Sequence, residues 1–292
     1  MDNPIISVIM PVYNGSKEFL SQAIESILNQ TLKNFEFLII DDGSTDPQIN
    51  ETILSYNDKR IKYLYKENSG VADSLNFGIK QAKGEYIARM DADDISLPER
   101  FEKQIAFLQS HPEVSLLGSW VEIFSKTGIK IWKTISEPKL FDFLIGSQLA
   151  HPVVMWRKKD FEEKKLKYDK NLVCSQDYDL WIRVSKAGLK IINLQEVLLK
   201  RRSHSNNISH TKREKQAQIA TTIKENLLEF LTCDPETQEK IKIFICGSSN
   251  MNSTSKWSLF HCTPFLTIKR IFNKANVKLL NFISLFKIKE KK

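Results

Sequence analysis

The stretch GEYIARMDADDISLPER (residues 84–100) carries the sharpest pattern in this sequence. Residues 86–90 are typical of a short buried strand, and three aspartates follow almost at once: Asp91, Asp93 and Asp94. Carboxylates crowded at a strand end repel one another and resist burial, and a divalent cation such as Mg²⁺ or Mn²⁺ offsets that cost. The alternative interpretation is a solvated acidic turn that caps the next helix, with Asp94 as the capping residue.

Before this stretch, apolar runs of strand length alternate with segments of helical periodicity. The expected strands are residues 5–10, 35–40 and 61–65, and the expected helices are residues 19–28, 49–56 and 70–82. This alternation predicts a mostly parallel, Rossmann-like sheet covered by helices, with ligands bound beyond the carboxyl ends of the strands. Polar residues follow the strands expected at 5–10, 35–40 and 86–90: Tyr13-Asn14, Asp41-Asp42 and the aspartates at 91 and 93, respectively. We therefore expect one polar rim, which favours a site over a helix cap.

Beyond this stretch the patterns predict a second half of the fold. Helices are expected at residues 98–109, 141–149 and 212–231 and within 172–186, strands at 114–124, 128–133, 153–157 and 189–199, and a basic loop at 200–209. An α/β fold class follows from these elements.

Composition limits the class of protein. The chain has 292 residues with a net charge of +8, and 41% of its residues are apolar, as in a soluble globular protein. Its four cysteines show neither CxxC nor metal-ligand spacing, which favours reduced thiols in the cytosol. The start of the sequence lacks the pattern of a signal peptide, and no run of about 18 apolar residues predicts a membrane span. We expect a cytoplasmic protein.

Seven motifs together resemble those of the family 2 glycosyltransferases, which have the GT-A fold. They are SVIMPVYNG (7–15), IIDDGSTD (39–46), NSGVADSLNFGI (68–79), GEYIARMDADD (84–94), HPVVMWR (151–157), QDYDLWIR (176–183) and the RxH at 202–204. They stand in the family's order and span roughly residues 4–210. The expected catalytic domain is therefore residues 1–210, with a nucleotide-sugar half of about 1–95 and an acceptor half of about 96–210.

The resemblance implies a nucleotide-diphospho-sugar donor of the UDP or dTDP type, Mn²⁺ or Mg²⁺ as cofactor, and inversion at the anomeric carbon. Pro11 and Tyr13 match the wall that packs on the base, and Asp42 matches the carboxylate that accepts from a uracil-like N–H. Asp91 lies near the ribose or the metal in that comparison, and Asp41 supports the turn.

On the reaction side, the resemblance assigns Asp93 as a metal ligand on the pyrophosphate and Asp177 as the catalytic base. His204 matches a residue that touches the metal or the phosphate; a solvated loop histidine is the alternative. In the family the base often follows a Glu, whereas Gln176 stands here, which removes a negative charge beside Asp177. A helix N-cap is the alternative role for Asp177, and Asp179 is the second candidate base.

The chemistry agrees with these roles. The leaving group is a diphosphate, whose growing charge a metal neutralises. An inverting transfer then needs one carboxylate to take the proton of the acceptor hydroxyl. His151 before Pro152 is expected either to shape the acceptor side or to be a structural histidine.

Residues 211–292 are expected to form a helical extension in which basic and aromatic residues interleave from residue 256 onward. Such segments bind anionic membrane surfaces, so we expect peripheral attachment to the inner face of the membrane and a lipid-linked acceptor. The alternative is a helical cap that packs on the catalytic domain or on a second copy.

The sequence thus predicts a metal-dependent inverting hexosyltransferase that acts on a glycan or lipid-linked glycan in surface polysaccharide or glycolipid synthesis. A catalytically weak sugar-nucleotide-binding protein and a nucleotidyltransferase are the alternatives; the latter would want a Gly-rich phosphate loop, which residues 11–15 (PVYNG) do not provide. No recognition motif accompanies the basic charge, so nucleic acid is not an expected partner.

Overall fold

The computed structural model describes residues 3–204 and 212–231. The chain divides into two compact units, Met1–Leu140 with Ser147–Ala220 and Phe141–Gly146 with Thr221–Lys292. Within the described ranges, no helix combines the length and the apolar character needed to cross a bilayer. The basic amphipathic tail lies outside the described residues, and the domain boundary near residue 210 stays a prediction.

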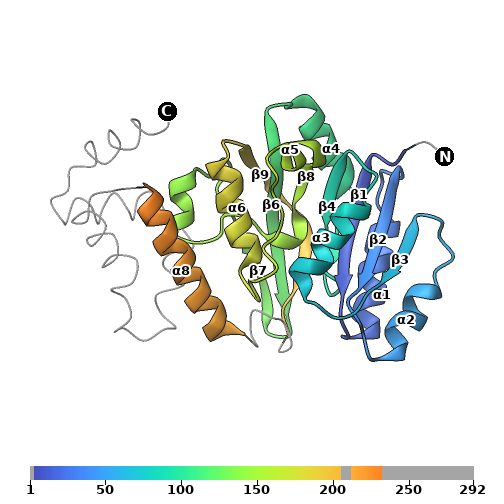
Figure 1. The fold of residues 1–292 in the computed structure, drawn as a ribbon. Coiled ribbons are helices and arrows are strands. Elements are labelled where there is room, and N and C mark those ends of the chain that lie inside the picture. The colour runs from blue at the N-terminus through green and yellow to red at the C-terminus, as the bar shows by residue number, and fades with distance from the viewer. Residues whose placement is uncertain (1–2, 205–211, 232–292) are drawn as a thin grey trace. The chain divides into compact units, whose positions relative to one another are not determined.

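Strands and helices alternate along the chain (Figure 1). The strands are β1 (Ile6–Val12), β2 (Phe35–Asp41), β3 (Ile61–Tyr65), β4 (Tyr86–Arg89), β5 (Ile95–Ser96), β6 (Val114–Ser125), β7 (Gly128–Trp132), β8 (Met155–Arg157) and β9 (Lys190–Arg202). The helices are α1 (Lys17–Leu28), α2 (Pro47–Leu54), α3 (Val71–Gln81), α4 (Arg100–Ser110), α5 (Lys158–Glu163), α6 (Gln176–Lys186) and α8 (Arg213–Leu231), with 3₁₀ turns η1 (Leu140–Leu144) and η2 (His151–Val153).

The described strands form one sheet in the order β3-β2-β1-β4-β8-β6-β9-β5, with β7 paired to β6. Strands β3, β2, β1 and β4 run parallel to one another. Strand β8 is antiparallel to both β4 and β6, and β9 runs parallel to β6. The sheet is therefore parallel in its N-terminal half and mixed beyond β4, and the predicted α/β fold is confirmed.

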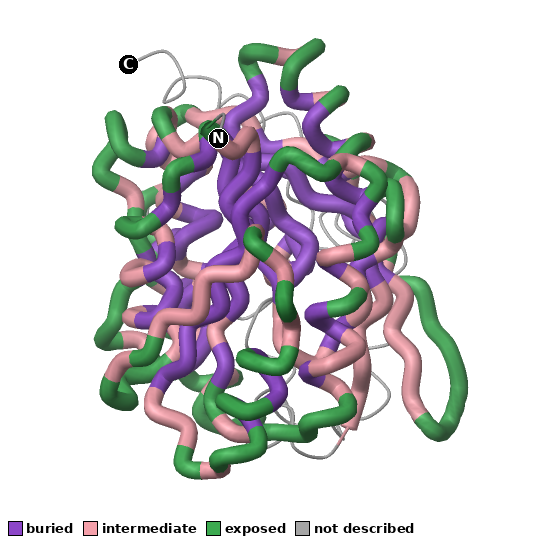
Figure 2. Tube along the Cα trace, turned by 90° about the vertical axis from the view of Figure 1, so that its right-hand side faces the viewer, coloured by how far each residue is buried: buried purple, intermediate pink, exposed green. Residues whose placement is uncertain are grey.

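Helices bury both faces of the parallel half. Val8 of β1 shares a buried core with Ile24 of α1 and Phe101 of α4. Ile9 points to the opposite face, as alternation along a strand requires. There Gly78 of α3 approaches so closely that a Cβ on it would lie 2.7 Å from Ile9 Cγ2. Buried residues accordingly concentrate along the central strands, and exposed residues lie on the surrounding loops and helices (Figure 2).

The loops after β1, β2 and β4 meet at one rim of the sheet, as predicted, because these strands are parallel neighbours. Asn14, after β1, ties the first two loops together. Its Oδ1 accepts from the backbone N–H groups of Thr45 (3.0 Å) and Asp46 (3.2 Å), and its own N–H donates to Ser44 Oγ (2.9 Å). The rim is therefore a connected structure.

Some predictions for the second half were wrong. Residues 200–202 continue β9 instead of forming a loop, because Lys200 pairs with Glu122 of β6 and with Ile95 of β5. The helix expected at 141–149 is only the 3₁₀ turn η1, which ends before Gly146, a poor helix former. Strand β5 and helix α5 were not predicted, since two and six residues are too short to show a periodic pattern.

Candidate functional site

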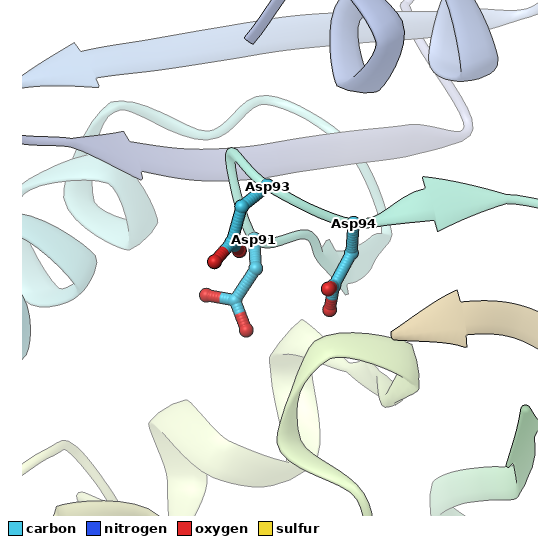
Figure 3. Close-up of side chains that lie close together, drawn as sticks. All are labelled: Asp91, Asp93 and Asp94. Atoms are coloured by element: carbon cyan, nitrogen blue, oxygen red, sulfur yellow. The ribbon is translucent and has the colours of Figure 1, made fainter. Parts of the chain in front are cut away.

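Three carboxylates converge in the loop between β4 and β5 (Figure 3). One oxygen from each of Asp91, Asp93 and Asp94 lies within 4.8 Å of the other two. The side chains of Asp91 and Asp93 lie next to each other, and that of Asp94 stands further along the loop toward β5. Arg89, the last residue of β4, is itself buried and forms an ion pair with Asp91.

Asp94 is a buried tether and not a helix cap. Its Oδ1 accepts from the backbone N–H of Arg202 at the end of β9 (2.8 Å), and its residue is 1% exposed. Helix α4 begins at Arg100 with Glu99 at its N-cap. The capping role predicted for Asp94 is therefore wrong, because a partner distant in the sequence occupies it.

Burial and mutual repulsion dominate the electrostatics of this loop. The pKa of Asp93 is raised by burial and then by the charge of Asp91, while the bond to His204 lowers it. Burial and the charges of Asp91 and Asp93 raise the pKa of Asp94 well above its usual range. Asp94 Oδ2 is also buried without a hydrogen-bond partner among the described residues. Three converging carboxylates, two of them with raised pKa values and one with an unsatisfied buried oxygen, fit a hard divalent cation.

The end of β9 brings two more polar side chains to the acidic loop. His204 Nε2 lies 2.9 Å from Asp93 Oδ2. Arg202 Nε donates to the backbone oxygen of Asp93 (3.0 Å), and its guanidinium lies 4.1 Å from the ring centre of Phe19. The RxH motif contained Arg202, but its contact with the acidic loop could be found only from the strand pairing. The predicted metal role of His204 stays a prediction.

Near the end of β1, where the sequence predicts a nucleotide, Pro11 is partly buried and pairs with Ile40 of β2. Tyr13, two residues on, is 54% exposed at the rim. An exposed aromatic face beside a proline can stack on a planar base. The packing of Pro11 and Tyr13 on a base stays a prediction.

Asp42 is buried and organises the neighbouring loop. Its Oδ1 accepts from Lys66 Nζ (2.7 Å) and from the backbone N–H of Ser69 (3.0 Å), and its Oδ2 accepts from the N–H of Gly70 (2.8 Å). Lys66 also forms an ion pair with Asp73. Asp42 therefore supports the start of α3, a structural role that the sequence did not indicate; its contact with the base stays a prediction.

Asp177 occupies the first turn of α6 and is partly exposed. Burial raises its pKa, against the lowering effect of backbone N–H groups and of the charges of Arg89 and Arg201. The N-cap position belongs to Ser175, so Asp177 is not the N-cap residue. Asp179 forms an ion pair with Arg183 (2.7 Å). Asp179 is held by Arg183, whereas the pKa of Asp177 is raised, so Asp177 stays the stronger candidate and its role as the base stays a prediction.

The structure brings the acidic loop and Asp177 together, although 83 or more positions separate them in the sequence. The charge of Arg89 acts on Asp177, and the same guanidinium pairs with Asp91. The charges of Asp177 and Asp91 both raise the pKa of the Tyr168 hydroxyl, whose largest perturbation is burial. Asp91 and Asp177 are therefore both close enough to Arg89 and Tyr168 for their charges to interact with these two buried groups.

Known proteins match this chain over most of its length. Residues 7–184 match the family model described as Glycosyl transferase family 2. An uncharacterized glycosyltransferase of Methanocaldococcus jannaschii is 39% identical over 226 residues, which are 74% of this chain and 77% of that protein. An uncharacterized glycosyltransferase of Haemophilus influenzae is 34% identical over 282 residues, covering 89% of this chain and 82% of that protein.

Among solved structures, the chain is similar to S. aureus TarS. The TarS 1-349 complex with UDP-GlcNAc has a TM-score of 0.66 and 18% identity, and covers 87% of this chain and 75% of that chain. The complex with UDP has a TM-score of 0.62, also at 18% identity, covering 84% and 73%. At this identity the likeness shows the fold, which is GT-A.

Proposed function

Because this chain belongs to glycosyl transferase family 2, we propose that it moves a hexose from a UDP- or dTDP-sugar to an acceptor hydroxyl with inversion of the anomeric carbon. The observation that carries the proposal is that the carboxylates of the acidic loop and the carboxylate of Asp177 belong to one site. The acidic loop can hold a diphosphate through a cation, and Asp177 stands apart from it as a base. TarS has been solved with UDP and with UDP-GlcNAc, which supports a uridine nucleotide as the donor here.

In this mechanism Asp91, Asp93 and Asp94 would hold Mn²⁺ or Mg²⁺, with His204 beside Asp93. The ion, when bound, neutralises charge on the departing diphosphate. Asp177 accepts the proton of the acceptor hydroxyl as its oxygen attacks the anomeric carbon. The glycosidic bond to the diphosphate breaks on the opposite face, and the nucleoside diphosphate leaves with the bonding electrons. No protein acid is needed for the leaving group.

The nucleotide is held by the rim after β1 and β2. Pro11 and Tyr13 form the wall for the base, and Asp91 serves the ribose or the metal. Asp42 accepts a hydrogen bond from the base N–H only if one of its carboxylate oxygens accepts from the base and from a protein donor at the same time. A carboxylate offers about four acceptor positions, which three short bonds and a longer one from Asn68 Nδ2 (3.4 Å) already use.

We further propose that the acceptor is a glycan, free or lipid-linked, in surface polysaccharide or glycolipid synthesis, and that the basic C-terminal segment brings a cytoplasmic enzyme to the inner membrane face. The support is the sequence alone, which interleaves basic residues such as Lys269 and Arg270 with aromatic ones such as Phe272. Full-length protein should sediment with vesicles that contain anionic lipid and not with neutral vesicles, and salt should release it. Equal sedimentation with both would contradict membrane attachment.

The test of the transferase itself is a panel of sugar nucleotides screened for Mn²⁺-dependent transfer and hydrolysis, with the anomeric configuration of the product read by NMR. Wild-type protein should consume one or a few donors. The Asp177→Asn variant should bind the same donors and transfer at least about 100-fold more slowly, in line with the usual size of general-base catalysis. Normal transfer by this variant would contradict the assignment of the base. Donor binding without transfer by the wild type would favour a sugar-nucleotide-binding protein.

A further inference from the structure

An imidazole lies between the two sides of the site. His151 starts η2, directly before β8, and β8 is the antiparallel neighbour of β4. The backbone N–H of Arg89 donates to Val154 (3.0 Å), so the start of this segment lies beside the end of β4, where the acidic loop begins. His151 is partly exposed. The proposed mechanism does not use it.

The base side reaches the same imidazole through an aromatic contact. Trp181 stands four residues after Asp177 in α6, so the two side chains share one face of that helix. The ring of Trp181 meets the ring of His151 edge-on, with the centroids 6.0 Å apart. His151 therefore lies between the acidic loop and the helix face that carries Asp177.

A buried tyrosine determines which imidazole nitrogen carries the proton. Tyr168 Oη lies 2.9 Å from His151 Nε2, and Tyr168 is 1% exposed. Burial raises the pKa of this hydroxyl, which keeps its proton. His151 is the hydrogen-bond partner of that hydroxyl in the described structure, and a buried O–H without an acceptor is costly. The hydroxyl therefore donates to Nε2, and the neutral imidazole carries its proton on Nδ1.

The surroundings hold the imidazole in place and keep it uncharged. Asn76 binds the backbone of Tyr168 twice, donating to its oxygen (2.9 Å) and accepting from its N–H (3.0 Å). Burial lowers the pKa of His151 well below its usual value, and the positive charges of Arg89 and Arg201 lower it further. Nδ1 has no hydrogen-bond partner among the described residues. The site thus presents one oriented, neutral N–H donor.

We propose that His151 donates this Nδ1–H hydrogen bond to a hydroxyl of the sugar ring that the nucleotide carries. The inference rests on the proposed function. The diphosphate is held at the acidic loop and the acceptor oxygen at Asp177, so the transferred ring lies between them, where His151 stands. A neutral donor suits a sugar hydroxyl, whereas a phosphate or a carboxylate would be matched by a cation. Tyr168 is the residue that orients the imidazole.

The experiment compares two ligands that differ only by the sugar. Dissociation constants for UDP and for the UDP-sugar identified by the panel are measured by calorimetry with Mn²⁺, on wild type and on His151→Phe and His151→Asn. The Phe variant should bind the UDP-sugar about 5- to 10-fold more weakly, the usual size of one hydrogen bond, and bind UDP unchanged. Asn keeps a donor near the Nδ1 position and should restore most of the difference. A purely structural role would weaken both ligands alike.

Two further readouts keep the inference open to refutation. The preference of wild type for the UDP-sugar over UDP should not change between pH 6.5 and 8, because the pKa of His151 is lowered well below its usual value and the imidazole stays neutral in that range. Thermal melting checks that each variant folds. If His151→Phe binds the UDP-sugar as tightly as wild type does, or loses the same factor of affinity for UDP and for the UDP-sugar, this inference alone is overturned. Failure of wild type to bind UDP or any sugar nucleotide would overturn the proposed function and this inference with it.

Discussion

Replacing Asp42 by Asn should destabilise the protein even without a ligand. Asp42 is 3% exposed, and three short hydrogen bonds reach its carboxylate: from Lys66 Nζ at 2.7 Å, the N–H of Ser69 at 3.0 Å and the N–H of Gly70 at 2.8 Å. A fourth, longer one comes from Asn68 Nδ2 at 3.4 Å. An amide has one oxygen and one NH₂ group in place of two oxygens. Whichever way the amide turns, the NH₂ group must face at least one donor that the carboxylate satisfied.

The magnitude follows from these contacts. A hydrogen bond to a charged group contributes roughly 1.5–3 kcal/mol, and a neutral one about 1 kcal/mol. Asn loses one bond and weakens those that remain. The Lys66 side chain is 15% exposed and keeps its ion pair with Asp73 at 3.3 Å, so its loss is only partial. We expect the free energy of unfolding to fall by about 2–4 kcal/mol.

Urea unfolding of the apo protein at pH 7 measures this change. The matched control is Asp46→Asn in the same loop region. Asp46 caps α2 by accepting from the N–H of Gln48 (3.0 Å), and Asn caps helices equally well, so this variant should change stability by less than about 0.5 kcal/mol. A loss below about 1 kcal/mol for Asp42→Asn would refute the reasoning. It would leave Asp42 with a role only toward the nucleotide.

Three further changes probe the site and its scaffold. Asp177→Asn should stabilise the fold at pH 7. Burial raises the pKa of Asp177 in the folded state above its unfolded value of about 3.9. The protonated carboxyl therefore favours the folded state at low pH, and this contribution to stability is lost as pH rises through the folded-state pKa. Urea unfolding should show that gain shrinking toward pH 3.5, and a gain equal at both pH values would contradict the raised pKa. Asp93→Ala should remove the Mn²⁺-dependent part of the thermal shift caused by UDP; a shift like that of wild type would exclude Asp93 as a ligand. Gly78→Ala should cost about 1–3 kcal/mol, because its Cβ would lie 2.7 Å from Ile9 Cγ2, whereas Gly146→Ala, with open space around it, should be close to neutral in the same unfolding assay.

The parallel half of the fold could be predicted because its signals are local. Each strand from β1 to β4 is a short, largely apolar run, and β1, β2 and β3 are each followed by a helix with its own periodicity. Parallel neighbours end at the same rim, so the positions of Asn14 and Asp41 in the sequence were enough to bring their loops together. For the strands β1 to β4 and the helices α1 to α3, the type was predicted correctly and only the ends shifted.

The features that could not be predicted depend on contacts between distant segments. The sequence around residue 94 is typical of a helix start, and its true partner, the N–H of Arg202, is 108 positions away. The basic character of residues 200–202 suggested a loop, but pairing with β5 and β6 makes them strand. His151 could be named as a candidate, yet its relation to Tyr168 and Trp181 depends on the packing of η2 against α6. Neither composition nor spacing carries such information.

The three aspartates therefore differ in structural role, because each one contacts a different partner. Arg89 is buried at the end of β4 and pairs with Asp91, which fixes one side of the loop. Asp94 fixes the other side by holding the end of β9, and that contact positions His204 against Asp93. A carboxylate held from both sides loses little further conformational freedom when it binds a cation. Its neighbours thus preorganise Asp93 for the proposed cation, and a substitution at Asp94 should weaken metal-dependent donor binding in two ways: it removes one of the three carboxylates and it loosens the contact that positions His204 against Asp93.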